Sequence, residues 1–129
     1  MPEIKWSEQF SVGVRVLDEQ HKRIIEMINA IQGRSDAGTM FDIVMRMFNY
    51  VPDHFKTEEN LMRKCGYSEL DQQIRQHKEF LVKATDFAGR NFDKPGACAQ
   101  VASYLREWLV HHILEEDMKY KPFLSPHGR

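Results

Sequence analysis

The chain has 129 residues, the usual size of one domain, and is long enough to bury a hydrophobic core without cross-links. Eighteen basic and nineteen acidic side chains leave a net charge of -1, and no basic run carries interleaved aromatic residues, so no nucleic-acid partner is expected. The chain has no signal-peptide pattern and no run of eighteen apolar residues, and Cys65 and Cys98 are expected to stay reduced, so the sequence predicts a cytoplasmic protein that does not enter membranes.

The N-terminal part of the chain is expected to differ from the rest. Residues 1–16 are predicted to form a non-helical arm, with Trp6 and Phe10 packed onto the remainder of the protein. A first helix follows, because apolar side chains recur at helical spacing across residues 17–31 and Gly33 ends the run.

The second helix is predicted to start at Thr39, which forms a capping signal with Asp42, and to close near Gly66. Its apolar face also carries His54 and Glu58, which are four residues apart and therefore point the same way.

Pro52 interrupts this predicted helix two residues before His54. It removes the hydrogen bond to the carbonyl of Phe48 and costs about 3 kcal/mol in a regular helix. Two interpretations remain open: local repacking tolerates the proline, or a kink adjusts the approach of His54 to a functional site.

Two more helices complete the pattern. The third is predicted to be capped by Ser68 with Asp71 and turns Gln73 and His77 inward. The fourth has its own start and stop signals: it follows Asp93 and Pro95, carries His112 on its inward face, and stops before Pro122.

Four helices with short links, and no long strand-like alternation, favour an all-α fold, an up-down-up-down four-helix bundle with a non-helical N-terminal arm. We expect a single domain over residues 1–129, with the arm at 1–16, the bundle at 17–120 and a tail at 121–129.

Polar side chains lie on each predicted apolar face: His21 on the first helix, His54 and Glu58 on the second, His77 on the third, and His112 and Asp117 on the fourth. Imidazole nitrogen and carboxylate oxygen together suit iron, manganese or zinc, and one metal site would satisfy groups that are costly to bury unpaired. Asp117 lies five residues after His112, about 140° around a regular helix, so this pair needs a distorted last turn. Each residue alone could be an ordinary buried histidine or ion pair; only their combination favours a metal site.

Several motifs are shared in order and spacing with a known family: Ser11-Val12-Gly13-Val14, Asp18-Glu19-Gln20-His21, His54-Phe55-x2-Glu58-Glu59-x2-Met62, Gly66-Tyr67, His77-Lys78-x-Phe80-Leu81 and Trp108-Leu109-x2-His112-x4-Asp117. From about Ile4 to Phe123 the chain resembles the hemerythrin family, specifically its single-domain bacterial members. The resemblance implies two iron ions inside the bundle, bridged by Glu58, Asp117 and an oxo or hydroxo group. It also implies that His21 and His54 hold one iron, which keeps an open position for dioxygen, and that His77 and His112 belong to the other.

The chain departs from the family at Gln73. The family's third helix reads His-x3-His, whereas this chain reads Gln73-x3-His77, and a neutral amide is a weaker donor to iron than imidazole. Gln73 could bind iron weakly, a water could fill the position, or one iron could be partly absent. His111 cannot easily substitute, because it points about 100° away from His112.

The function predicted from this resemblance is reversible dioxygen binding, for carriage, storage or delivery, by a monomer. One alternative is a di-iron enzyme with peroxidase, ferroxidase or NO-reducing activity, since the change at Gln73 could leave both irons open. Another is an oxygen or iron sensor, or an iron-storage module. The sequence identifies no protein partner.

Overall fold

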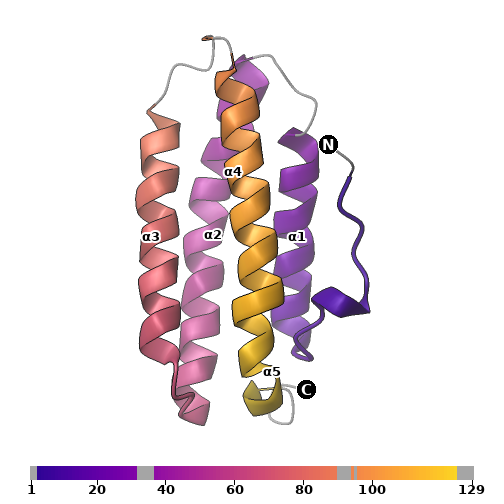
Figure 1. The fold of residues 1–129 in the computed structure, drawn as a ribbon, viewed down its shortest axis with the longest axis vertical. Coiled ribbons are helices and arrows are strands. Elements are labelled where there is room, and N and C mark those ends of the chain that lie inside the picture. Colours follow the sequence, from indigo (N-terminus) through magenta and orange to yellow (C-terminus); the bar gives the residue numbers. More distant parts are fainter. Residues whose placement is uncertain (1–2, 32–36, 90–93, 95, 125–129) are drawn as a thin grey trace.

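The computed structural model describes residues 3–31, 37–89, 94 and 96–124. Their helices, in chain order, are the 3₁₀ turn η1 (Glu8–Phe10), α1 (Arg15–Ile31), α2 (Ala37–Cys65), α3 (Leu70–Ala88), α4 (Ala97–His111), the π-helix η2 (His112–Asp117) and α5 (Met118–Leu124). The four long helices run alternately up and down, side by side, and α5 lies at the lower end near the C-terminus (Figure 1). The expected all-α four-helix bundle is confirmed.

The N-terminal arm lies along the outer side of α1 (Figure 1). The side chain of Asn29 joins the two, since it accepts a hydrogen bond from the amide of Ile4 and donates one to its carbonyl. Phe10 is buried and stacks with Trp6 at 5.7 Å between ring centroids. Phe10 belongs to the hydrophobic core and Trp6 packs against it, so the expected packing of both aromatic residues onto the bundle is confirmed. The predicted end of the arm at residue 16 was wrong, because α1 already begins at Arg15, and the arm also contains the short 3₁₀ turn η1.

Both expected side-chain caps were wrong. Helix α2 already includes Ala37, so Thr39 lies inside it, and the buried side chain of Met40 anchors this first turn to the core. The residue that caps α3 is Glu69 rather than Ser68, and the Glu69 side chain makes no capping hydrogen bond. A backbone bond from the amide of Leu70 to the carbonyl of Tyr67 leads into α3 instead.

The start and stop signals of the other helices have mixed outcomes. Gly33, Asp93 and Pro95 lie outside the described residues. Helix α4 begins at Ala97, directly after Gly96, whose φ of 80° is a conformation that glycine adopts without strain.

Neither internal proline ends a helix. Helix α2 continues through Pro52, which is flanked by the buried Val51 and lies three residues before the buried Phe55. The expected stop before Pro122 was wrong, because α5 continues to Leu124. A proline removes one hydrogen bond, and burial of the neighbouring apolar side chains offsets that loss.

The interior consists of two apolar clusters with a polar layer between them. We refer to the buried polar side chains as the polar layer, which consists of His21, His54, Glu58, Gln73, His77, His112 and Asp117. On one side lies a large cluster that includes Ile24 and Phe55; on the other lies a small cluster formed by Val12, Val14, Leu17, Met62, Tyr67, Tyr120 and Leu124. Along α1 the order is Leu17, His21, Ile24, so this helix crosses from the small cluster through the polar layer to the large one.

The two cysteines lie far apart in sequence and form no disulfide with each other. Cys65 ends α2, where its Sγ lies 3.4 Å from the carbonyl of Met62, and Cys98 is buried in α4. Within the described part of the chain, no helix is both long and apolar enough to cross a bilayer.

Candidate metal centre

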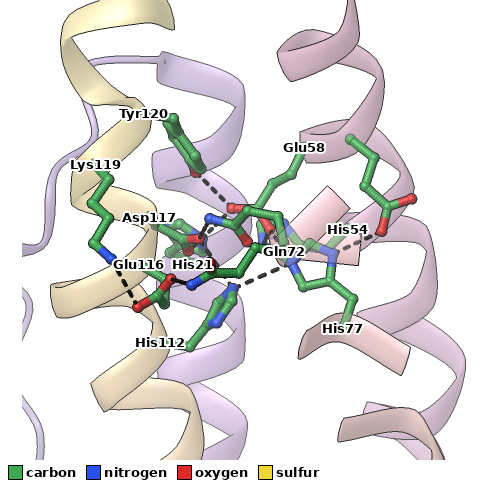
Figure 2. A network of polar contacts seen from close by, with 12 residues as sticks. His21, His54, Glu58, Gln72, His77, His112, Glu116, Asp117, Lys119 and Tyr120 are labelled. Atoms are coloured by element: carbon green, nitrogen blue, oxygen red, sulfur yellow. Dashed lines mark hydrogen bonds and ion pairs between the residues drawn. The ribbon is translucent and has the colours of Figure 1, made fainter. Parts of the chain in front are cut away.

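All six residues expected at a metal site come together in the polar layer, although four separate helical segments supply them. One donor atom from each of His21, His54 and Glu58 lies within 4.8 Å of the others, and the same holds for Glu58, His77, His112 and Asp117. Figure 2 shows these side chains converging between the helices. Because Glu58 belongs to both groups, the two groups form one continuous donor set.

Asp117 reaches this set because the helix changes its geometry between His112 and Asp117. These six residues form the π-helix η2, whose turns are wider than those of α4 before it. In a regular α-helix the two side chains would diverge by about 140°. In the wider turn the Nε2 of His112 and the Oδ1 of Asp117 lie 3.1 Å apart, so the expected distortion of this last turn is confirmed.

The donor atoms are spaced as they would be around a metal ion. The Nε2 atoms of His77 and His112 are 3.2 Å apart, and Glu58 oxygens lie 3.2 Å from Nε2 of His54, 3.3 Å from that of His21 and 3.4 Å from that of His77. Two atoms bound at about 2.1 Å to one ion, at angles near 90–110°, lie roughly 3.0–3.4 Å apart. Most of these separations exceed the usual hydrogen-bond length of about 2.9–3.0 Å.

Several buried polar atoms in the layer have no hydrogen-bond partner among the described residues: Nδ1 and Nε2 of His21, Oε1 of Glu58, Oε1 of Gln73 and Oδ2 of Asp117. An unsatisfied buried group costs about 1–3 kcal/mol, and more if it is charged. A bound cation would satisfy the carboxylate oxygens and the Nε2 of His21 at once, so this donor set fits a cation.

The Nδ1 atoms of two histidines contact side chains to which the sequence analysis gave no such role. The Nδ1 atom of His54 lies 2.7 Å from Oε1 of Gln20, and that of His77 lies 2.7 Å from Oε2 of Glu59. An N–H donated from Nδ1 fixes the tautomer in which Nε2 is free to bind a metal. The partner of Glu59 lies 18 residues away on another helix, so no local sequence pattern marks this role of Glu59.

Tyr120 is a third residue that sequence reasoning missed. Its hydroxyl donates a hydrogen bond of 2.6 Å to Oε2 of Glu58, reaching the carboxylate from α5 (Figure 2). Tyr120 is three residues after Asp117, a spacing that places two side chains on one helical face, and this was the available signal.

Comparison with known proteins agrees with the site. A family model described as the hemerythrin HHE cation-binding domain matches residues 12–124. The chain belongs to the hemerythrin family. Bacteriohemerythrin of Pseudomonas aeruginosa is 30% identical over 124 residues, covering 93% of this chain and 80% of that protein. The hemerythrin-like protein of Naegleria gruberi is 33% identical over 120 residues, covering 92% of each.

A solved structure supports the same conclusion. The crystal structure of a wild-type hemerythrin superposes with a TM-score of 0.80 at 27% identity, covering 96% of this chain and 99% of the other. Family membership and the buried His, Glu and Asp clusters together make this hemerythrin-family chain a candidate metal-binding protein.

The charge balance of the hemerythrin site depends on protons when no cation is bound. Burial opposes a charge on His21, but attraction from the carboxylates of Asp117 and Glu58, each with an oxygen 3.3 Å from Nε2, outweighs it and raises the pKa of His21 to about 10. Burial likewise opposes a charge on His77, yet Glu58 and Glu59 raise its pKa to about 9. For His54, burial dominates and lowers the pKa.

The carboxylate at the centre stays ionised. Burial alone would raise the pKa of Glu58, but the imidazoles of His54, His21 and His77, all within 3.4 Å of the carboxylate, hold it well below its usual range. Burial, together with the charges of Asp117 and Glu58, raises the pKa of Tyr120 well above 10, so its hydroxyl remains a donor. Protonated histidines thus supply positive charge that a cation would otherwise bring.

Aromatic rings of the large cluster cover one side of the hemerythrin site. Phe55 stacks on His77 with ring centroids 3.8 Å apart and planes 2° from parallel, and Trp108 stacks on His112 at 4.6 Å and 10°. These contacts fix both imidazole planes and keep water away from that side.

Gln73 is the residue at which the sequence analysis expected a departure from the family pattern. It is buried, at 2% exposure, and its amide nitrogen donates a 3.2 Å hydrogen bond to Oδ1 of Asp117. The side chain therefore points toward the donor set, as expected, and it contacts the carboxylate rather than an imidazole.

Proposed function

We propose that this chain is a non-haem di-iron protein that binds dioxygen reversibly. The observation that carries the proposal is the position of Glu58, which belongs to both donor groups and can therefore bridge two metal ions. Asp117 supports the same arrangement, because Oδ2 lies 3.3 Å from His21 and Oδ1 lies 3.1 Å from His112. Membership of the hemerythrin family supports iron and dioxygen as the metal and the ligand.

In this proposal His21 and His54 hold one iron, and His77 and His112 hold the other. Glu58 and Asp117 would offer carboxylate oxygens to both ions. When bound, two iron(II) ions can jointly give dioxygen two electrons and take them back when it leaves.

The protein's own residues supply orientation and protection. Gln20 and Glu59 hold the rings of His54 and His77 with Nε2 directed inward. Tyr120 keeps a hydrogen bond on Glu58, so that carboxylate has a fixed position between the two metal sites. Phe55 and Trp108 exclude water, which favours release of unchanged dioxygen over its further reduction.

One observation favours a second candidate, a di-iron enzyme with peroxidase, ferroxidase or NO-reducing activity. Gln73 replaces a family histidine and hydrogen-bonds to Asp117, which leaves the iron beside His77 and His112 with one imidazole fewer. No comparable observation favours an oxygen or iron sensor. That the 129 residues form one monomeric, cytoplasmic domain stays a prediction from the sequence.

The test is iron per chain by elemental analysis, combined with the visible spectrum through cycles of oxygenation and deoxygenation. Two irons per chain and an oxo-to-iron absorption band that appears and disappears reversibly are the expected results. Zinc, or no metal, in protein purified from cells supplied with iron would overturn the proposal. Rapid autoxidation with catalysed loss of added peroxide would favour the enzyme instead.

A further inference from the structure

The orientation of the Gln73 amide has a chemical cause. The amide faces Oδ1 of Asp117. An ionised carboxylate accepts hydrogen bonds and cannot donate one. An amide NH2 facing a carboxylate is attractive, whereas an amide oxygen in the same place would be repelled. The Gln73 side chain is therefore fixed by donation through its nitrogen, and its Oε1 atom must point elsewhere.

That oxygen is buried and has no hydrogen-bond partner among the described residues. A buried acceptor without a donor is unfavourable by about 1–3 kcal/mol. A small ligand that carries a hydrogen, such as water, would satisfy it. Gln73 thus acts as a support for Asp117 and leaves an acceptor available for such a ligand, which differs from the role of a metal-binding histidine.

The two halves of the donor set are equal once Gln73 is not counted as a ligand. His21 and His54 face oxygens of Glu58 and Asp117, and His77 and His112 face oxygens of the same two carboxylates. Each metal would therefore receive two imidazoles and the same two bridging residues. If two imidazoles and two carboxylates leave an open coordination position on one metal, they leave an open position on the other metal as well.

We propose that the metal held by His77 and His112 has its own exchangeable position for a small ligand, beside the Gln73 amide. Water occupies it in the resting protein, with a hydrogen donated to Oε1 of Gln73, and small anions can replace that water. This inference rests on the proposed di-iron function. It gives the chain two neighbouring ligand positions, one on each metal.

The test counts azide ions bound to the oxidised, iron-loaded protein by optical titration and equilibrium dialysis. The wild-type chain should bind two azide ions per chain. Gln73→His should bind one, because the added imidazole fills the second position, and Gln73→Leu should bind two, because leucine offers no donor to the metal. Gln76→His is the matched control: it adds an imidazole to α3 one turn beyond Gln73, on a partly exposed position, and should leave the count at two.

Each other outcome overturns the proposal. One azide for the wild type and two for Gln73→Leu would mean that Gln73 itself binds the metal. One azide for both would mean that the second metal has no open position. Two irons per chain with a single azide site would overturn this inference alone, whereas fewer than two irons would overturn the di-iron function as well. The wild-type and Gln73→Leu counts decide the matter even if Gln73→His does not fold.

Discussion

The two halves of the centre hold their histidines in different ways. In the half formed by His21 and His54, a neutral amide from Gln20 lies behind His54; in the half formed by His77 and His112, the carboxylate of Glu59 lies behind His77. Both contacts are 2.7 Å long. A carboxylate partner makes an imidazole a stronger donor to a metal than a neutral partner does. The half that contains Gln73 is thus the one whose histidine has the stronger hydrogen-bond partner.

Ring packing follows the same division. Both imidazoles of the His77–His112 half stack on aromatic rings of the large cluster, whereas His21 and His54 meet each other edge to face at 4.6 Å. The His77–His112 half is therefore oriented by side chains outside the donor set. The difference teaches that two halves with the same number of imidazoles can be fixed to different degrees, and the variants below separate the contribution of the donor atoms from that of the side chains that orient them.

The largest effect is expected from Glu58→Ala, which removes the residue common to both halves. Iron content should fall sharply at both positions, because each metal loses a ligand and buried histidines lose their anionic partner. His54→Ala should mainly empty its own half. Elemental analysis of the two variants gives the comparison, and full iron loading in both would contradict the bridging role of Glu58.

A second large effect concerns pH in the metal-free protein. The pKa values of about 10 for His21 and about 9 for His77 lie above the value of 6.5 for an unfolded histidine. Their contribution to the free energy of unfolding is fully present below about pH 6.5 and is lost as the pH rises through 9 to 10. The unfolding temperature should therefore fall on the order of 10 °C between pH 7 and 10.

Thermal unfolding measured with and without iron checks this prediction. Variants of His77 and His21 then show how much of the fall in unfolding temperature comes from each half. His77→Gln should make the fall shallower up to about pH 9, and His21→Gln should make it shallower up to about pH 10, so that the fall above pH 9 is lost only in His21→Gln. The iron-loaded protein should resist alkali, because metal-bound histidines are already neutral, and should instead release iron in acid, when protons compete for its ligands. Equal alkaline stability of the metal-free wild type and both variants would contradict the assignment of positive charge to His21 and His77.

An intermediate effect is expected from the residues behind the histidines. Glu59→Gln should speed release of iron from the His77–His112 half by about 10 to 100-fold, because the imidazole loses its anionic partner. Gln20→Ala should speed release from the other half only. A chelator time course that resolves two phases would show each variant acting on one phase, and an identical change in both phases would rule out separate support for the two halves.

The smallest effect is expected from Tyr120→Phe, which removes the hydroxyl that donates to Glu58. Loss of this buried bond should lower the free energy of unfolding by about 1–3 kcal/mol. Since Glu58 is common to both halves, both release phases should change together. Tyr104→Phe, on α4 away from the polar layer, is the control for removing a phenol. A shift confined to one phase would mean that Tyr120 supports only one half.

The bundle and the convergence of the six candidate ligands could be predicted because both depend on patterns repeated over many residues. Helix ends could not, because a cap signal such as Thr39 or Ser68 is short. It is overruled when the helix already continues past it, as at Thr39 beside the buried Met40, or when a backbone turn leads into the helix instead, as at Leu70. The pairing of Glu59 with His77 depends on how α2 and α3 are rotated against each other. Gln73 was recognised as a departure, but its hydrogen bond to Asp117 required the structure.

The π-helix η2 acts on the chain like the insertion of one extra residue. Each residue of an α-helix turns the chain by about 100°, so one additional residue within a turn changes which side chains that follow it face inward. Beyond η2, Tyr120 and Leu124 are the buried side chains of α5, and Tyr120 is the one that reaches Glu58. The same widened turn therefore directs the last carboxylate to the centre and decides which face of the final helix closes the small cluster. Removing a single residue between His112 and Asp117 would rotate Asp117 away from the centre and Tyr120 away from Glu58. The length of this segment is therefore constrained more tightly than the identity of its exposed residues.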